Sequence, residues 1–327
     1  MKHLSTLLKF GATVALFWFV LSKVDIADLA ARLTVTQIAV ALAAGLGAVS
    51  VQALVAAIRL MLCVRLLGGE VTTRGAWVAC QYGGFFSHTP ISFVGGDAMR
   101  IWHLVKLDVP LADSAKAVVV DRALGFMAMM SFVIVTSPLL YSAIRDVTML
   151  TGYVILVTIG AAAIVAFLLL GGVRPIPTRS RILRWIAEFA TVSRYLAVRP
   201  RLAAEAFLLA LTVSVLNVIA IWGIALGYSG EVGFITALAA TPVVFLIAMV
   251  PISVAGWGLR EGAFVVAFGL FGVPASAALS ISVTFGIAVL LAYSPAAVLL
   301  VMARRQTSAP GKDEEYAPAS APPPGRS

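Results

Sequence analysis

The stretch PISFVGGDAMR (90–100) interrupts an apolar region and has a partial copy, PISVAGWGLRE (251–261), much further along the chain. Both copies combine Pro-Ile-Ser, glycine and charged residues. Proline supplies no backbone N–H and disfavours helix in the residue before it, so each copy should end a helix. The glycines that follow permit the close or positive-φ turn from which a new helix starts. Each stretch therefore predicts a broken helix.

The sequence around these two stretches is strongly apolar. The 327-residue chain is 61% hydrophobic and only 12% charged, whereas a soluble domain carries about 25% charged residues. Apolar runs of about 20 residues, which cross a bilayer core as a helix, explain this deficit. We predict an all-α polytopic membrane protein, with residues 1–305 as its membrane domain. The six full spans are expected at 6–22, 36–58, 117–141, 149–171, 203–227 and 276–302.

The net charge of +9 predicts an orientation rather than a nucleic-acid site, because positive residues between spans mark cytoplasmic segments. The residues assigned to the cytoplasm are Lys2, Lys9, Arg59, Arg65, Arg74, Lys106, Lys116, the seven arginines of 174–201, Arg304 and Arg305. The external loops keep Lys23, Arg32 and Arg145, offset by Asp25, Asp28, Asp146 and Glu231. We therefore expect a multi-pass protein of the cell (inner) membrane with both termini in the cytoplasm.

Two segments at the cytoplasmic face have distinctive compositions. The arginines of 174–201 alternate with apolar and aromatic residues, which predicts an amphipathic helix lying on an anionic leaflet. The tail 306–327 is rich in Pro, Ala and Ser and is expected to be disordered.

The two interrupted regions, 74–99 and 234–271, must each enter and leave the membrane on one side for this topology to hold. They are either re-entrant hairpins or pairs of short spans, and the short arms after the breaks favour hairpins. Three full spans separate them, so the two regions face opposite ways. Opposed broken helices that meet near mid-membrane are how many secondary transporters form a site. The repeated motif thus predicts an inverted repeat.

The helix that restarts after each break presents unpaired N–H groups, which attract anions. Arg100 and Arg260 follow within about a turn, and arginine binds phosphate with two hydrogen bonds. In the alternative interpretation Arg100 only reaches to the interface, and Glu261 neutralises Arg260. The other candidate substrate-binding residues of the two motifs are Ser92, Gly95, Gly96, Asp97, Ser253, Gly256 and Gly258.

Asp121 and Arg122 form a second charged pair inside a predicted span. Adjacent residues of a helix do not face each other, so each is expected to have its own partner. Arg122 either faces a cavity or pairs with Asp97. The alternative is an interfacial pair one turn into the span.

The elements at Pro90–Arg100, Asp121-Arg122 and Pro251–Glu261 together resemble the flippase-like membrane region of the lysylphosphatidylglycerol synthetases. That family also contains many stand-alone membrane proteins. The likeness covers roughly residues 5–305, and P-I-S-x-x-G-x-G-x-R-E is its most specific part. The resemblance implies movement of lipids or lipid-linked groups between leaflets.

Two departures limit what the resemblance implies. A synthetase of this family carries a large soluble catalytic domain after its spans, whereas here a Pro/Ala/Ser-rich tail follows. Lipid aminoacylation is therefore not implied for this chain. Asp121 also stands where the family is expected to have Glu.

The leading hypothesis is a lipid flippase whose phosphate-bearing cargo contacts Arg260, Arg122 and Arg100. The expected partners are membrane lipids, either an anionic phospholipid or a polyprenyl-phosphate-linked lipid, and no cofactor, metal ion or nucleic acid is expected. No G-x-x-x-x-G-K-[ST] motif is present, so transport would use an ion or lipid gradient. Cys63 and Cys80 lack metal-type spacing and are interpreted as packing residues.

Three alternatives remain open at this point. The chain is an accessory subunit of a separately encoded lipid-modifying transferase, with 174–201 as its docking face. It is an acyltransferase, since His103 and Asp108 have the H-x-x-x-x-D spacing in which the histidine acts as base. Or it carries a soluble solute, because opposed broken helices do not require a lipid cargo.

Overall fold

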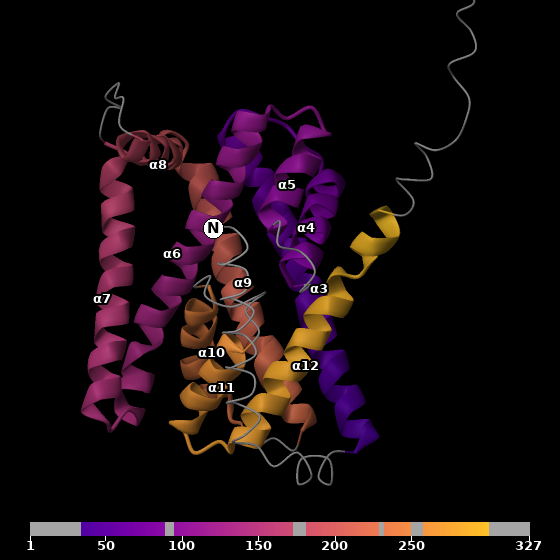
Figure 1. Cartoon of the computed structure of the whole chain (residues 1–327), viewed down its shortest axis with the longest axis vertical. Coiled ribbons are helices and arrows are strands. Elements are labelled where there is room, and N and C mark those ends of the chain that lie inside the picture. The colour runs from indigo at the N-terminus through magenta and orange to yellow at the C-terminus, as the bar shows by residue number, and fades with distance from the viewer. Residues whose placement is uncertain (1–33, 89–94, 173–180, 229–231, 250–257, 301–327) are drawn as a thin grey trace, which may run out of the picture.

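The computed structural model describes residues 34–88, 95–172, 181–228, 232–249 and 258–300, and every regular element among them is an α-helix (Figure 1). The helices are α3 (Val35–Leu66), α4 (Thr73–His88), α5 (Gly96–Val105), α6 (Leu111–Ala143), α7 (Val147–Leu170), α8 (Arg181–Val198), α9 (Pro200–Gly227), α10 (Phe234–Ala248), α11 (Leu259–Gly269) and α12 (Ala275–Tyr293). The predicted span 6–22 and the tail 306–327 lie outside the described residues.

Among the described residues, five helices are long and apolar enough to cross a membrane, namely α3, α6, α7, α9 and α12 with its continuation to Leu300. They coincide with five of the six predicted spans, and the polytopic all-α fold is confirmed. The predicted end of the first of them, at residue 58, was wrong, because α3 continues to Leu66. Arg59, which the charge pattern assigned to a segment between spans, is instead a buried residue within α3. A charge is tolerated there because it has an ion-pair partner.

Each interrupted region forms a hairpin of two short helices. The first contains α4 and α5, which contact each other, and the second contains α10 and α11, which do the same. At 1.5 Å per residue, α5 and α11 span only about 15 Å, half of a bilayer core of about 30 Å. They are too short to cross, so the re-entrant interpretation is favoured over pairs of full spans. In Figure 1 the first hairpin occupies the end of the bundle that carries α8, and the second occupies the opposite end.

The helices form two units of the same design, α3–α6 and α9–α12. In each unit the first long helix contacts the hairpin, the hairpin contacts the second long helix, and the two long helices contact each other. The contacts between units match as well: α4 packs on α12 as α10 packs on α6, and α3 on α12 as α9 on α6. With the opposed directions of the hairpins, this pattern bears out the inverted repeat.

The two units meet along α3 and α9, where small residues allow close packing. A Cβ added to Gly227 would lie 2.6 Å from the backbone nitrogen of Ala41, and one added to Gly45 would lie 2.8 Å from Cδ1 of Ile224. Small residues at helix contacts are typical of membrane proteins, since apolar side chains gain little by leaving lipid. The α3–α9 contact therefore fixes how the repeats sit together.

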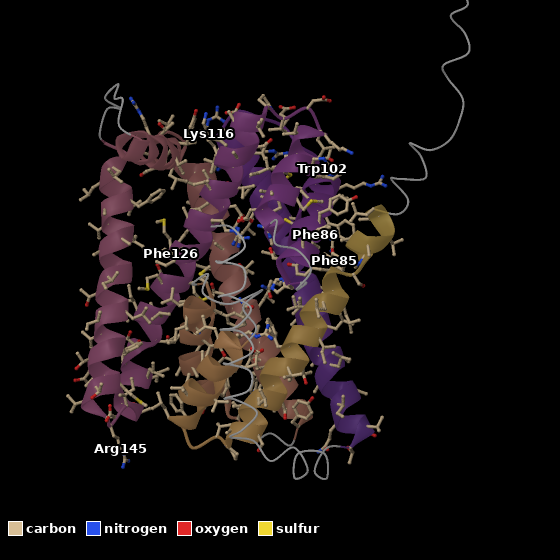
Figure 2. All side chains as sticks on the ribbon, viewed as in Figure 1. Phe85, Phe86, Trp102, Lys116, Phe126 and Arg145 are labelled. Atoms are coloured by element: carbon tan, nitrogen blue, oxygen red, sulfur yellow. The ribbon has the colours of Figure 1, made fainter. Side chains whose placement is uncertain are left out.

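The helices α7 and α8 lie outside the repeat. Only Tyr153 and Gly160 of α7 are buried, while α8 lies across one end of the bundle, within the predicted amphipathic segment 174–201 (Figure 1). Lys116 lies at this α8 end of the molecule and Arg145 at the opposite end (Figure 2). Which end faces the cytoplasm remains a prediction from the charges.

Candidate functional site

The first hairpin brings α5 against α4 through glycines. A Cβ on Gly96 would overlap the carbonyl oxygen of Gly83, and a Cβ on Gly83 would overlap the side chain of Arg100. Gly95 is the N-cap of α5 and makes no side-chain cap hydrogen bond. Since α5 has 10 residues, its N-terminus lies about 15 Å inward from the α8 end of the bundle. The helix start that the motif predicts therefore lies inside the bundle rather than at its α8 end.

A buried carboxylate, Asp121 of α6, holds two arginines from different helices. Arg59 of α3 donates from Nε to Oδ1 at 2.7 Å and from Nη2 to Oδ2 at 3.1 Å. Arg100 of α5 donates from Nη1 to Oδ2 at 3.4 Å. Asp121 is 2% exposed, so this triad is sealed from solvent and ties α3, α5 and α6 together. Burial of charged side chains is tolerated when ion pairing and hydrogen bonds offset the loss of their hydration.

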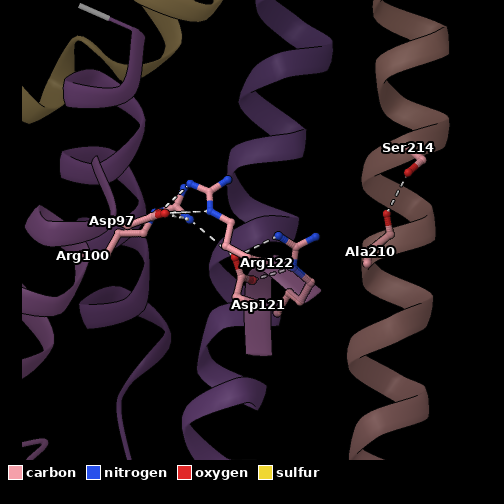
Figure 3. Close-up of polar contacts among 7 residues, drawn as sticks. Asp97, Arg100, Asp121, Arg122, Ala210 and Ser214 are labelled. Atoms are coloured by element: carbon pink, nitrogen blue, oxygen red, sulfur yellow. Dashed lines mark hydrogen bonds and ion pairs between the residues drawn. The ribbon is translucent and has the colours of Figure 1, made fainter. Parts of the chain in front are cut away.

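The neighbouring pair is open. Arg122 of α6 donates to both carboxylate oxygens of Asp97, with Nη2 2.6 Å from Oδ1 and Nε 3.0 Å from Oδ2 (Figure 3). The side chains of Arg122 and Asp97 are 48% and 43% exposed. Of the two alternatives predicted for Arg122, a cavity position or a pair with Asp97, the structure shows the pair, and Arg122 also lines a pocket. Adjacent residues of α6 thus point to different partners, one sealed and one accessible.

This cluster, which we call the arginine cluster, contains Arg59, Arg100, Arg122, Asp97 and Asp121. Three cations face two carboxylates, so it carries one positive charge in excess at the start of α5. In addition, the buried Nε of Arg100 has no hydrogen-bond partner among the described residues. An anion is the kind of partner that would compensate this excess charge.

The second hairpin restarts at Gly258, whose φ of +86° is the positive-φ turn that the motif predicts. Glu261 accepts from the backbone N–H of Gly258 at 2.6 Å and from Nη2 of Arg260 at 2.7 Å. Ser282 of α12 adds a hydroxyl hydrogen bond to Glu261 and a carbonyl acceptor for Arg260. Glu261 is fully buried and Arg260 nearly so. This pair caps α11 and joins it to α12, and Glu261 neutralises Arg260 as foreseen.

The predicted residues thus fall into two groups. Asp97, Arg100, Asp121 and Arg122 come together in the arginine cluster, with Gly95 and Gly96 at the adjoining helix start, while Gly258, Arg260 and Glu261 form a separate buried pair and cap. Ser92, Ser253 and Gly256 lie outside the described residues. Arg59 was not predicted as a residue of the site. The apolar run LMLCV that follows it could have indicated that Arg59 lies inside a helix, since a span rarely ends where such a run continues.

The H-x-x-x-x-D pair does not assemble in the described structure. His103 packs edge-on against the ring of Tyr82, with centroids 5.2 Å apart, and no hydrogen bond joins it to Asp108 among the contacts described. The acyltransferase interpretation therefore gains no geometric support.

The cysteines and carboxylates of the described residues form no metal centre. Cys63 and Cys80 are buried, free thiols, which agrees with a packing role. No group of three or more His, Cys, Asp or Glu side chains in the described ranges is arranged to hold a metal ion.

A comparison with protein families decides the wider assignment. Residues 6–297 match the family model described as the lysylphosphatidylglycerol synthase TM region. The chain belongs to this family. The match spans both hairpins and all helices from α3 to α12, so the arginine cluster and the Arg260–Glu261 pair both lie within the lysylphosphatidylglycerol synthase TM region. No curated protein and no solved structure matches the chain. Membership supports a lipid-related role in the membrane.

Proposed function

We propose that this protein moves a phosphate-bearing lipid between the leaflets of the cell membrane. The observation that carries the proposal is the arginine cluster, where three arginines face two aspartates at the start of a re-entrant helix. A lipid headgroup that crosses a bilayer must exchange its water for other polar partners. An accessible arginine beside a helix N-terminus supplies such partners for phosphate.

Arg122 is the residue we assign to the phosphate. It is half exposed, and its present partner Asp97 is equally exposed, so an incoming anion can replace that carboxylate. Arg100 contributes positive charge from its buried position, 3.4 Å from Asp121. Arg260, by contrast, is enclosed with Glu261 and Ser282, and we assign it a supporting role in the second hairpin.

Two features support a lipid cargo rather than a soluble solute. The family is that of a lysylphosphatidylglycerol synthase membrane region, and the exposed surface of the spanning helices is apolar. Anionic phospholipids and polyprenyl-phosphate-linked lipids both offer the required phosphate. A separately encoded lipid-modifying enzyme that supplies the cargo is a compatible partner, with α8 as the contact face.

The test is leaflet exchange of a fluorescent phosphatidic acid in vesicles that contain the purified protein. Wild-type protein is expected to accelerate exchange above protein-free vesicles, and Arg122→Gln to reduce this acceleration by about tenfold, as for the loss of one charge-assisted contact. Lys116→Gln, which removes a half-exposed cation at the α8 end, is the matched control. Exchange at the protein-free rate with wild-type protein would refute the proposal.

A further inference from the structure

The space between α6 and α7 is a groove that the repeat architecture does not require. The two helices touch toward the Arg145 end, where Ser137 Oγ lies 2.7 Å from the hydroxyl of Tyr153 and Met130 packs against Gly160. They part toward the α8 end (Figure 1). Between them lies a pocket of about 500 Å³, within the range of about 300–1,000 Å³ for small-molecule sites.

The groove has a long apolar wall and one charged end. Its wall includes Val119, Ala123, Phe126 and Met127 from α6, with Ile164 and Phe167 from α7. Its polar end is the ion pair Asp97–Arg122, which lines the same pocket. The site is therefore divided chemically, with hydrocarbon contacts along two spanning helices and a cation at one extremity.

The location decides which class of molecule suits such a site. Both walls belong to helices long and apolar enough to cross the membrane, so the surrounding solvent is hydrocarbon rather than water. A soluble anion would contact Arg122 alone and leave the apolar wall unused. A lipid with a phosphate at one end of an acyl chain contacts both parts at once.

We propose that the α6–α7 groove binds one acyl chain of a phospholipid whose phosphate replaces Asp97 on Arg122. The assignment rests on the proposed function, for which it names the entry site and the two-part recognition of the cargo. Asp97 keeps a partner when it is displaced, because its Oδ1 lies 3.7 Å from Nη1 of Arg100. Displacement thus transfers the carboxylate from an open arginine to a buried one without leaving it unpaired.

The test uses the full-length protein in phosphatidylcholine vesicles with a trace of phosphatidic acid that carries a diazirine in one acyl chain. After irradiation, cross-linked residues are mapped by mass spectrometry. Ile164→Trp fills the groove, whereas Val165→Trp adds the same bulk at the next residue, which is 55% exposed. Labelling of α6 and α7 groove residues is expected in wild type and Val165→Trp, and to fall about tenfold in Ile164→Trp because overpacking excludes the chain.

A second arm separates the phosphate from the chain. Arg122→Gln is expected to lower labelling by the phosphatidic acid probe but not by a diacylglycerol probe, which has the chain without the phosphate. Inorganic phosphate at the concentration of the lipid probe should leave labelling unchanged. Complete competition by inorganic phosphate, or equal labelling of the two tryptophan variants, would overturn the groove assignment.

Leaflet exchange measured in the same vesicles distinguishes the two proposals. Groove labelling without exchange would refute the proposed function and leave the binding site standing. Exchange by the wild type together with an unlabelled groove would refute the binding site and leave the function standing.

Discussion

Arg122 of α6 and Asp97 of α5, 25 residues apart in the chain, are joined by a two-pronged ion pair that is about half exposed on both sides. An exposed pair of this kind contributes about 0–1 kcal/mol to stability. Its position at the start of a re-entrant helix is therefore of more interest for ligand binding than for folding.

Removal of the competing carboxylate tests this interpretation. Asp97→Asn leaves Arg122 without its charged partner, so binding of phosphatidic acid is expected to tighten while the melting temperature Tm changes little. Fluorescence titration in detergent micelles measures the affinity. Binding of diacylglycerol, which lacks the phosphate, should stay the same, and a weaker affinity for phosphatidic acid would contradict the assignment.

Asp121→Asn should be strongly destabilising. It leaves Arg59 and Arg100 buried without their carboxylate, and loss of one partner from a buried ion pair costs about 3–5 kcal/mol. The measurement is the thermal unfolding of the purified protein in detergent. Asp113→Asn is the control, since it removes the same group from the half-exposed pair with Lys116 and should lower Tm only slightly. Equal melting temperatures for the two variants would rule out a sealed triad.

The Arg260–Glu261 pair calls for a double-mutant cycle. Arg260→Met and Glu261→Gln each leave one buried polar partner uncompensated, so each should lower the free energy of unfolding by about 3–5 kcal/mol. The free energy of unfolding of the double variant is expected to fall by clearly less than the sum of the two single losses, because neither charge is then left without its partner. Additive losses would show that the two side chains do not act as a pair.

The same double variant separates a structural role of Arg260 from a role in binding. If the pair only caps α11 and joins it to α12, the folded double variant should still accelerate leaflet exchange. A folded double variant without exchange would return Arg260 to the substrate site, as its place in the motif first indicated.

Gly96→Ala should disrupt the first hairpin, whereas Gly95→Ala should not. A Cβ at Gly96 would overlap the backbone oxygen of Gly83, which cannot move like a side chain, but a Cβ at Gly95 meets nothing within 4 Å. Overpacking of this kind costs about 1–3 kcal/mol. Tm and the yield of monodisperse protein measure the difference, and equal values for the two alanine variants would argue against close contact at Gly96.

Much of the fold followed from the sequence because a bilayer constrains a chain strongly. Apolar length located five of the described spans, and the proline and glycine breaks located both hairpins. Helix ends were less accurate. Arg59 ended a span in the prediction, because a lone charge is costly in hydrocarbon, yet Asp121 on another helix removes that cost. Pairing between distant helices is not visible in a single sequence.

The sequence predicted most residues of the site, but not which arginine among them is accessible. The motif copies gave Arg260 the stronger signal, since it lies deeper in an apolar region. In the structure Arg260 is buried, because Glu261 and Ser282 surround its side chain. Arg122, which the sequence presented as one of several charges, is the accessible one. Exposure depends on how α5, α6 and α7 are arranged, and this arrangement is a tertiary property.

The two repeats match in shape but not in chemistry, and this mismatch has a consequence for direction. The unit α3–α6 holds five charged groups in the arginine cluster, while the unit α9–α12 holds the closed Arg260–Glu261 pair. A frame with twofold symmetry alone would serve both leaflets equally. Among the described residues the exposed arginine, Arg122, lies in the first unit, whereas Arg260 of the second is enclosed. On the proposed function, lipids that arrive from the two leaflets would meet unequal sites, so we expect them to enter the protein at different rates.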